Sequence, residues 1–329
     1  MMRKRQQFRY HPGKLLAAIA VLAMASVASG PSRAADFPSR DITFIVPYAP
    51  GGGSDQQARR LQEGLQKALG VTLRIVYKTG GGGAVGFLEL HSSKPDGYTI
   101  ANVVVPNIIV TAKGENVGYK PEDFSYIGMT EQAVGALVVP KDGKFKTLKD
   151  LIAYAKANPG KLTIAGTGSA GHANFAEIVH ALGIKATYVP VSGGVGKTIP
   201  YLQGGHVDAA VFASSHAAKH STTITALGLA GSESSPALPG VPTFKSLGHE
   251  GFEMATTWGI MAPPGTPADV VKVLNAALQK TVSDPKVKDA QVKNGLTPMS
   301  QTPEKARDFV LGTIKSVQRT EELVKALPK

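Results

Sequence analysis

Short apolar runs alternate with segments of helical periodicity along most of this chain. Residues 42–46 and 73–77 are apolar runs that predict strands. Between them Leu61, Leu65 and Leu69 recur every four residues, which is one face of a helix, and Gly70 is a typical helix stop. Further strands are predicted at 98–105, 136–140, 162–165, 186–189, 208–212, 225–230 and 258–261. Strands that alternate with helices favour parallel pairing and an α/β fold.

The later helices carry start and stop signals of their own. Thr147 with Asp150 predicts a capped helix that ends at 158–160, and a second helix is predicted over 173–182. After Pro263 the pattern is helical, beginning with an N-cap at Thr266 and continuing in helices from 284 and 303. We expect this tail to pack on the first sheet.

The order of the elements predicts two α/β lobes, each a mostly parallel sheet flanked by helices. We expect residues 36–137 and 258–329 to form the first lobe and 138–257 the second. The glycine-rich loops would then lie at the carboxyl ends of strands, where open α/β sheets bind ligands. A ligand cleft between the lobes would bring these loops face to face.

The most informative of these loops follows the strand 42–46 and opens the next helix. Glycines let the backbone approach a ligand closely, and a helix start leaves N–H groups that can hold an anion. Asp55, in the first helical turn, is expected to be a cap or dipole partner and not a general base. The candidate ligand-binding residues of this loop are Tyr48, Gly51, Gly52, Gly53, Ser54 and Asp55.

Other loops are expected to complete the site. A second glycine-rich loop, 166–171, follows the strand 162–165, and a third occupies 192–196. Residues 214–216 are expected at the far end of the cleft. The candidate ligand-binding residues outside the first loop are Thr79, Gly82, Thr167, Gly168, Ser169, Ala170, His172, Ser192, Gly193 and Ser214.

The N-terminus predicts export. Basic residues precede an apolar, alanine-rich run at 15–28, and a small-residue site predicts signal-peptide cleavage near Ala34. The run is too short for a confident membrane span. Residues 1–34 hold six of the 36 Lys and Arg and none of the 24 Asp and Glu, so the net charge falls from +12 to +6 on cleavage. That mild excess lacks the clustered basic stripe that nucleic acid needs. The absence of cysteine excludes thiol catalysis and Cys-based metal sites.

Four motifs that suggest other chemistry are incomplete. Gly81–Gly86 fits the dinucleotide fingerprint, but the next strand does not end in the required acid. Gly196-Lys197-Thr198 lacks the first glycine of a P-loop, since Val191 stands there. Thr167 replaces the glycine that a nucleophile elbow at Ser169 requires. His216 and His220 could share a helix face but lack a third metal ligand. We therefore expect no catalytic residue, metal or cofactor.

Several segments together resemble one family. The segments 47–55, 80–86, 95–99, 165–169, 189–190, 204–208 and 258–267 resemble the Bug (TctC-like) solute-binding proteins, in consistent order from about residue 37 to about 310. The resemblance implies a type II periplasmic-binding-protein fold that closes on a small carboxylate, and a tripartite tricarboxylate transporter as partner. It also implies that backbone amides and hydroxyls of the loops 48–55 and 167–172 hold the carboxylate.

The chain departs from the family pattern at two places. Thr79 and four glycines stand where the family tends to have Asn-x-Pro-Gly-Ala-Gly-Gly, and Val191-Ser192-Gly193 replaces Tyr-Lys-Gly. The loss of an aromatic and a lysine favours a flexible aliphatic dicarboxylate as ligand. The leading hypothesis is a monomeric periplasmic carboxylate receptor that docks on membrane permease subunits. The alternatives are a binding protein for carboxylate sensing and an exported α/β hydrolytic enzyme.

Overall fold

The computed structural model describes most of the chain after residue 36. The described ranges are 37–113, 117–166, 168–191, 195–231, 233–249 and 254–327, without the side chains of 168–170. From Pro38 onward the chain forms one compact unit. The predicted signal peptide and its cleavage site near Ala34 lie outside the described residues. None of the helices in the described ranges is both long and apolar enough to cross a membrane.

The first group of strands follows the order β2-β1-β3-β9-β4. Apolar residues fill these strands, and the buried faces belong mainly to Ile, Val, Phe and Met side chains. The strands are β1 (Ile42–Val46), β2 (Leu73–Tyr77), β3 (Thr99–Val105), β4 (Ser125–Pro140) and β9 (Ala255–Ala262), with β10 (Thr297–Pro298) paired to β4.

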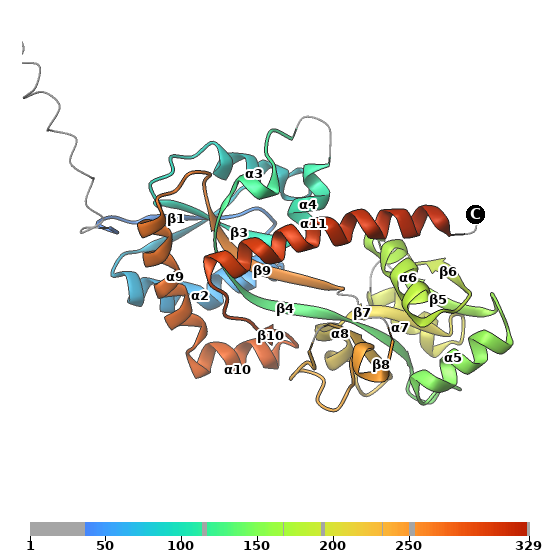
Figure 1. Cartoon of the computed structure of the whole chain (residues 1–329). Coiled ribbons are helices and arrows are strands. Elements are labelled where there is room, and N and C mark those ends of the chain that lie inside the picture. The colour runs from blue at the N-terminus through green and yellow to red at the C-terminus, as the bar shows by residue number, and fades with distance from the viewer. Residues whose placement is uncertain are drawn as a thin grey trace, which may run out of the picture. The chain divides into compact units, whose positions relative to one another are not determined.

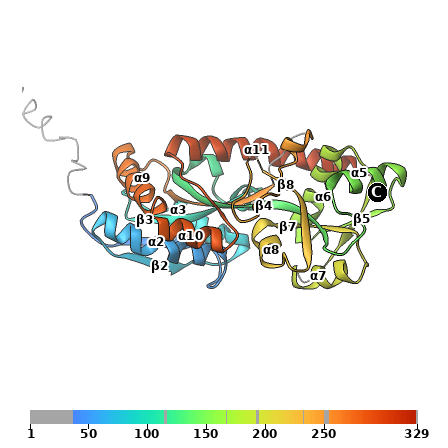
Figure 2. The same cartoon turned by 90° about the horizontal axis from the view of Figure 1, so that it is seen from below.

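The second group is built on the second half of β4. β4 pairs with β9 as far as Val134 and with β7 and β8 from Gly135 onward, so one strand serves both groups (Figure 2). The further strands are β5 (Leu162–Gly166), β6 (Ala186–Pro190), β7 (Ala209–Ala213) and β8 (Ile224–Ala230). The division into lobes at 137 and 258 stays a prediction.

The pairing corrects the expectation of mostly parallel sheets. β1 pairs in parallel with β2 and β3, and β5 pairs in parallel with β6 and β7. β4 and β9, however, run antiparallel to their neighbours. Both sheets are therefore mixed, because the strands that pass between the two groups run against the βαβ units.

Helices cover both groups of strands (Figure 1). α5 begins with the predicted capping box of Thr147 and Asp150, and α2 ends at Gly70 with φ +72°. The helices are α2 (Gly53–Leu69), α3 (Ala84–His91), α4 (Asn107–Ala112), α5 (Leu148–Ala157), α6 (Gly168–Leu182), α7 (Val195–Gln203), α8 (Ser214–Lys219), α9 (Ala268–Val282), α10 (Pro285–Lys293) and α11 (Pro303–Ala326), with short 3₁₀ turns η2 (Gly81–Gly83), η3 (Pro121–Asp123) and η4 (Lys245–Leu247).

Four points of the predicted secondary structure need correction. α6 begins at Gly168, not at 173, so part of the second glycine-rich loop is helical. The Thr266 hydroxyl donates to the Pro263 carbonyl and does not cap α9, which begins at Ala268. The sequence patterns also missed α4 and the first eleven residues of β4.

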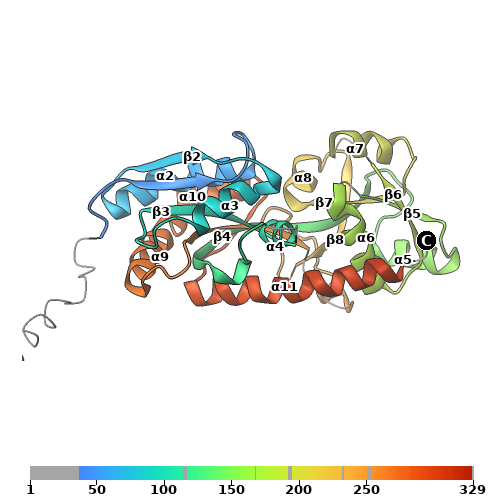
Figure 3. The ribbon, with the colours of Figure 1, turned by 90° about the horizontal axis from the view of Figure 1, so that it is seen from above.

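The long helix α11 packs on the first group of strands, as expected for the tail, and it also reaches the second group (Figures 1 and 3). Ala306 and Val310 are buried in the core formed with β3 and α3. Farther along, Arg319 donates to Glu177 of α6 at 2.8 Å, and Leu327 packs on the core beside β5. The C-terminal helix thus connects the two halves of the described structure.

Candidate ligand-binding site

The turn between β1 and α2 leads directly into the helix. Gly51 has φ +83°, a conformation that favours glycine, and Gly52 is the extended N-cap residue. The first turn of an α-helix leaves backbone N–H groups without intrahelical acceptors. The N–H groups of Gly53, Ser54 and Asp55 are therefore available at the helix start, where the helix dipole favours an anion.

Asp55 holds this turn together. It is only 5% exposed, and its carboxylate accepts a hydrogen bond from the Gly51 N–H at 2.7 Å. The Tyr77 hydroxyl and Arg59 Nε donate to the other oxygen at 2.7 and 2.8 Å. Burial alone would raise the pKa of Asp55, but the hydrogen bonds from Gly51 and Tyr77 and the charge of Arg59 lower it below its usual value.

Asp55 therefore acts as a charged structural group, as expected of a cap or dipole partner. The same contact corrects one detail of the sequence prediction. The Gly51 N–H already donates to Asp55, because the first helical turn brings the carboxylate back over the turn. The amides left for a ligand are those of the helix start itself.

The two glycines next to the helix start have different surroundings. A Cβ at Gly53 would lie 2.9 Å from Cζ2 of Trp258, so the indole ring requires glycine there. A Cβ at Gly52 would meet only the Ala49 carbonyl oxygen, at 3.4 Å, and its φ of −75° suits any residue. Within the described structure nothing requires glycine at position 52, and its open side is accessible to a ligand.

Two hydroxyl groups border the same turn without a partner in the described residues. Ser54 is 3% exposed, and its hydroxyl makes no hydrogen bond there. The Tyr48 hydroxyl is buried and also unpartnered, while its ring meets Phe87 edge-on with centroids 6.3 Å apart. Burial raises the pKa of Tyr48, and the nearby Asn107 side chain offsets this only in part. Both groups are hydrogen-bond donors beside the start of α2.

The segment 79–86 lies against this turn. Gly80, Gly81, Gly82 and Gly83 have φ of +139°, +55°, +68° and +106°, which explains the run of four glycines where the family tends to have other residues. A Cβ at Gly83 would lie 3.0 Å from the Tyr48 hydroxyl oxygen. Thr79 and Gly82 are exposed. The structure thus brings Tyr48 and this segment together.

The second candidate loop leads into α6. Gly168, Ser169 and Ala170 form the first turn of that helix, so their backbone N–H groups, like those of α2, lie at a helix start. A Cβ at Gly171 would lie 2.6 Å from the Gly166 carbonyl carbon, so the strand end and the helix start touch through glycines. Thr167 lies outside the described residues.

The remaining candidate residues have their rings or hydroxyl groups in contacts with other residues, or lie outside the described ranges. His172 is exposed and stacks on Tyr188 with ring centroids 4.8 Å apart. Ser214 is fully buried, and its hydroxyl donates to the Gly295 carbonyl oxygen at 3.1 Å. This hydroxyl is therefore committed to joining α8 to the tail. Ser192 and Gly193 lie outside the described residues.

These contacts bring together one half of the candidate site. Tyr48, Gly53, Ser54 and the segment 79–86 surround the start of α2. Among the hydrogen bonds and ion pairs of the described ranges, none joins the turn 48–55 to residues 168–172. That the starts of α2 and α6 face each other across a ligand is accordingly a proposal.

A buried polar network anchors α2 beneath the site. Gln57 donates to the Thr130 hydroxyl at 2.9 Å and accepts from Asn102 at 2.7 Å. One turn farther along, Arg60 donates to both carboxylate oxygens of Glu131, at 3.1 and 2.7 Å. Because Glu131 is 1% exposed, this bidentate pair is shielded from water. The network fixes the rotation of α2 on the sheet and therefore the direction of its free N–H groups.

Sequence reasoning did not select the residues that position the site. Tyr77, Arg59 and Gln57 support the α2 turn, and Trp258 and Asn107 flank it. A signal for Tyr77 existed, because β2 was predicted parallel to β1 and the carboxyl ends of parallel strands share one edge. The Gln57 contact with Thr130 had no such signal, because it joins residues far apart in the sequence. Elsewhere in the described ranges, no three His, Asp or Glu side chains gather as a metal site.

Comparison with known proteins identifies the family. Residues 57–328 match the TctC model, described as the tripartite tricarboxylate transporter family receptor. Protein BugT of Bordetella pertussis is 30% identical over 309 residues, which are 92% of this chain and 94% of BugT. A ligand-free TctC solute-binding protein from Polaromonas is 25% identical with a TM-score of 0.77, and the match covers 88% of this chain and 100% of that chain.

A relative with a ligand belongs to the same group. MatC from Rhodopseudomonas palustris, solved with bound malate, is 27% identical with a TM-score of 0.62, and the match covers 88% of this chain and 100% of MatC. The comparisons confirm the predicted α/β type II periplasmic-binding-protein fold. The chain belongs to the TctC, or Bug, family of tripartite tricarboxylate transporter receptors, which are periplasmic binding proteins and not enzymes.

Proposed function

We propose that this chain is an extracytoplasmic receptor that binds a small carboxylate between two lobes and delivers it to a tripartite transporter. Residues 1–34 would direct export and be removed near Ala34. The observation that carries the proposal is the start of α2, where the backbone N–H groups of the first turn lack intrahelical acceptors and a Cβ at Gly52 would meet only the Ala49 carbonyl oxygen. Such a site suits an anion without a buried arginine.

The malate bound to MatC supports a small carboxylate as the ligand class. In this chain the helix starts of α2 and α6 would each offer N–H groups to the carboxylate. We infer a flexible aliphatic dicarboxylate, because Val191 and small residues replace the family's aromatic and lysine at the far end of the cleft. The Tyr48 hydroxyl would provide a further contact.

The mechanism would be closure of the lobes around the ligand. A carboxylate that touches α2 and α6 at once contacts both only in the closed state, so binding shifts the equilibrium toward closure. The ligand leaves unchanged, since the family consists of binding proteins. The closed form would then be recognised by the membrane subunits.

The test uses the open space at Gly52. Gly52→Leu introduces a side chain where only the Ala49 carbonyl oxygen lies nearby, at 3.4 Å, so the free protein should fold normally. The matched control is Gly312→Leu, at an exposed position of α11 where a Cβ would meet nothing within 4 Å. Titration calorimetry with malate, succinate and adipate, and with the uncharged butane-1,4-diol, would measure binding to each protein.

We expect at least one dicarboxylate to bind the wild type and Gly312→Leu, and its affinity to fall at least about 100-fold in Gly52→Leu at unchanged melting temperature. A bulky group at the ligand position should remove most of the binding energy. Equal dicarboxylate affinity in Gly52→Leu and wild type would refute the site. Binding of the diol but of no acid would refute the carboxylate class.

A further inference from the structure

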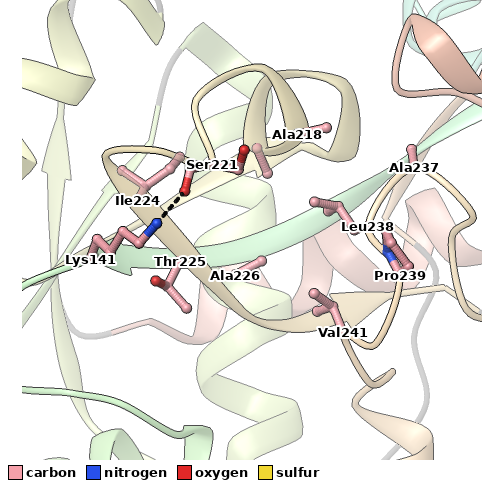
Figure 4. Close-up of a pocket in the computed structure, with 11 residues that line it drawn as sticks. Lys141, Ala218, Ser221, Ile224, Thr225, Ala226, Ala237, Leu238, Pro239 and Val241 are labelled. Atoms are coloured by element: carbon pink, nitrogen blue, oxygen red, sulfur yellow. Dashed lines mark hydrogen bonds between the residues drawn. The ribbon is translucent and has the colours of Figure 1, made fainter.

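A pocket of about 340 Å³ lies far along the chain from the proposed carboxylate site, on the second group of strands. It is bounded by α8, by the start of β8 and by the segment 237–241 (Figure 4). β8 pairs with β4 along one edge, and Leu229 bridges to Thr243 on the other. The preceding residues of β8, 224–226, line the pocket.

The polar groups of this pocket gather at one end. Lys141, Ser221 and Thr225 lie there beside the apolar Ile224, and Leu238, Pro239 and Val241 lie at the other end (Figure 4). Ala226 lies between them (Figure 4). A ligand with one polar end and an apolar body therefore suits this lining.

The polar end carries the ammonium group of Lys141, an exposed residue. Lys141 Nζ donates to the Ser221 carbonyl oxygen at 3.2 Å, which directs the ammonium group toward the pocket and leaves further donors for a ligand. Within the described residues Lys141 forms no ion pair. The Thr225 hydroxyl, at the same end, likewise has no hydrogen-bond partner there. An ammonium and a hydroxyl suit a carboxylate.

The volume sets the size of the ligand. An apolar cavity of about 150 Å³ holds a benzene-sized molecule, so about 340 Å³ has room for a ligand of up to roughly 13 non-hydrogen atoms. Pockets of this size are typical of small-molecule sites. We propose that this pocket is a second ligand site, separate from the dicarboxylate site, that binds a medium-chain aliphatic monocarboxylate. Its carboxylate contacts Lys141 and Thr225, and its hydrocarbon chain lies against Leu238 and Val241.

The experiment uses octanoate, which has the required size, and octanol as its uncharged analogue. Calorimetry of the full exported chain would compare the wild type with Lys141→Met, which keeps the length of the side chain and removes its charge. The control is Lys146→Met, since Lys146 donates to the Lys141 carbonyl oxygen at 3.0 Å but does not line the pocket. Ala226→Leu fills the pocket with an apolar group, and Gly52→Leu blocks the α2 site.

We expect octanoate to bind the wild type, Lys146→Met and Gly52→Leu alike, and to bind at least about tenfold more weakly to Lys141→Met. Octanol should bind more weakly than octanoate and be insensitive to Lys141→Met. Ala226→Leu should abolish octanoate binding and leave dicarboxylate binding intact, which shows that the fold survives. Octanoate binding that is lost in Gly52→Leu and kept in Ala226→Leu would overturn the proposal, as would equal affinity for Lys141→Met or no binding to the wild type.

Discussion

The two helix starts proposed to hold the ligand are fixed by different forces. At α2 the stabilising contacts are made by polar side chains. Asp55 accepts hydrogen bonds from Gly51, Tyr77 and Arg59, and Arg60 forms an ion pair with buried Glu131. At α6, the described backbone is held by close packing, since Gly171 touches the end of β5 at Gly166. Farther along α6, Glu177 also pairs with Arg319, but the described contacts at the helix start itself are packing contacts of Gly171. Free N–H groups are thus held in place by charged side chains at the start of α2 and by close glycine packing at the described start of α6.

This difference predicts different sensitivities. The α2 start should respond to loss of charge and to pH, because its contacts depend on ionised groups. The α6 start should respond to added volume, because packed interiors tolerate few extra atoms. The comparison would be refuted if the α2 start tolerated loss of charge or if the α6 start tolerated added volume.

The largest effect is expected at Arg60. Arg60→Leu leaves the Glu131 carboxylate, 1% exposed, with only the Gln291 side-chain amide as a hydrogen-bond donor within the described residues. Breaking a buried ion pair by removing one partner costs about 3–5 kcal/mol, because an uncompensated charge stays buried. Urea denaturation of the variant should show a loss of that size in the free energy of unfolding.

The control is the double variant Arg60→Leu with Glu131→Leu. Replacing both charges by apolar groups removes the uncompensated charge, so the double variant should be more stable than Arg60→Leu alone. The single variant Glu131→Leu completes the comparison. If the stability losses of Arg60→Leu and Glu131→Leu simply add in the double variant, the two side chains do not interact, and charged contacts do not hold α2 in place.

The next effect is expected at Gly171. Gly171→Ala places a Cβ 2.6 Å from the Gly166 carbonyl carbon and 2.8 Å from the Tyr188 hydroxyl oxygen. Because one of these neighbours is backbone, the strand end or the helix start must shift, at a cost of about 2–3 kcal/mol. Thermal and urea denaturation would measure it. Gly312→Ala adds the same methyl group to open space and should be neutral or slightly stabilising. Equal stability of the two variants would contradict the packing of α6.

The sequence predicts a structural feature well when the contacts that produce the feature lie between residues close together in the chain. The strands 42–46 and 73–77 are predicted to the residue, because mainly apolar runs end at polar or glycine-rich turns. The capping box of α5 is likewise a contact between neighbours, Thr147 and Asp150. Patterns within one element therefore predict most of the β1–α2 region.

The missed features have distant causes. In β4 the apolar pattern is interrupted by Glu131 and Gly135, yet the strand continues because Glu131 pairs with Arg60 and Gly135 fits against Met254. The start of α6 was predicted as a loop, since Gly and Ser are weak helix formers, and tertiary packing overrides that preference. For the candidate site, the α2 start was predictable, but its support by Tyr77 and Gln57 depends on the fold.

The smallest effect concerns pH and distinguishes the two helix starts most directly. Because hydrogen bonds and Arg59 lower the pKa of Asp55 in the folded state, its stabilisation is fully present above the unfolded pKa of about 3.9 and is lost as pH falls through the folded pKa. Asp55→Asn should cost about 1.5 kcal/mol at pH 7, the value of a hydrogen bond to a charged group. The stability difference between wild type and variant, measured by urea denaturation, should shrink as the pH falls below about 4. Gly171→Ala removes no charge, so its stability difference should stay constant over the same range. A constant difference for Asp55→Asn would show that the α2 turn does not depend on the ionised carboxylate.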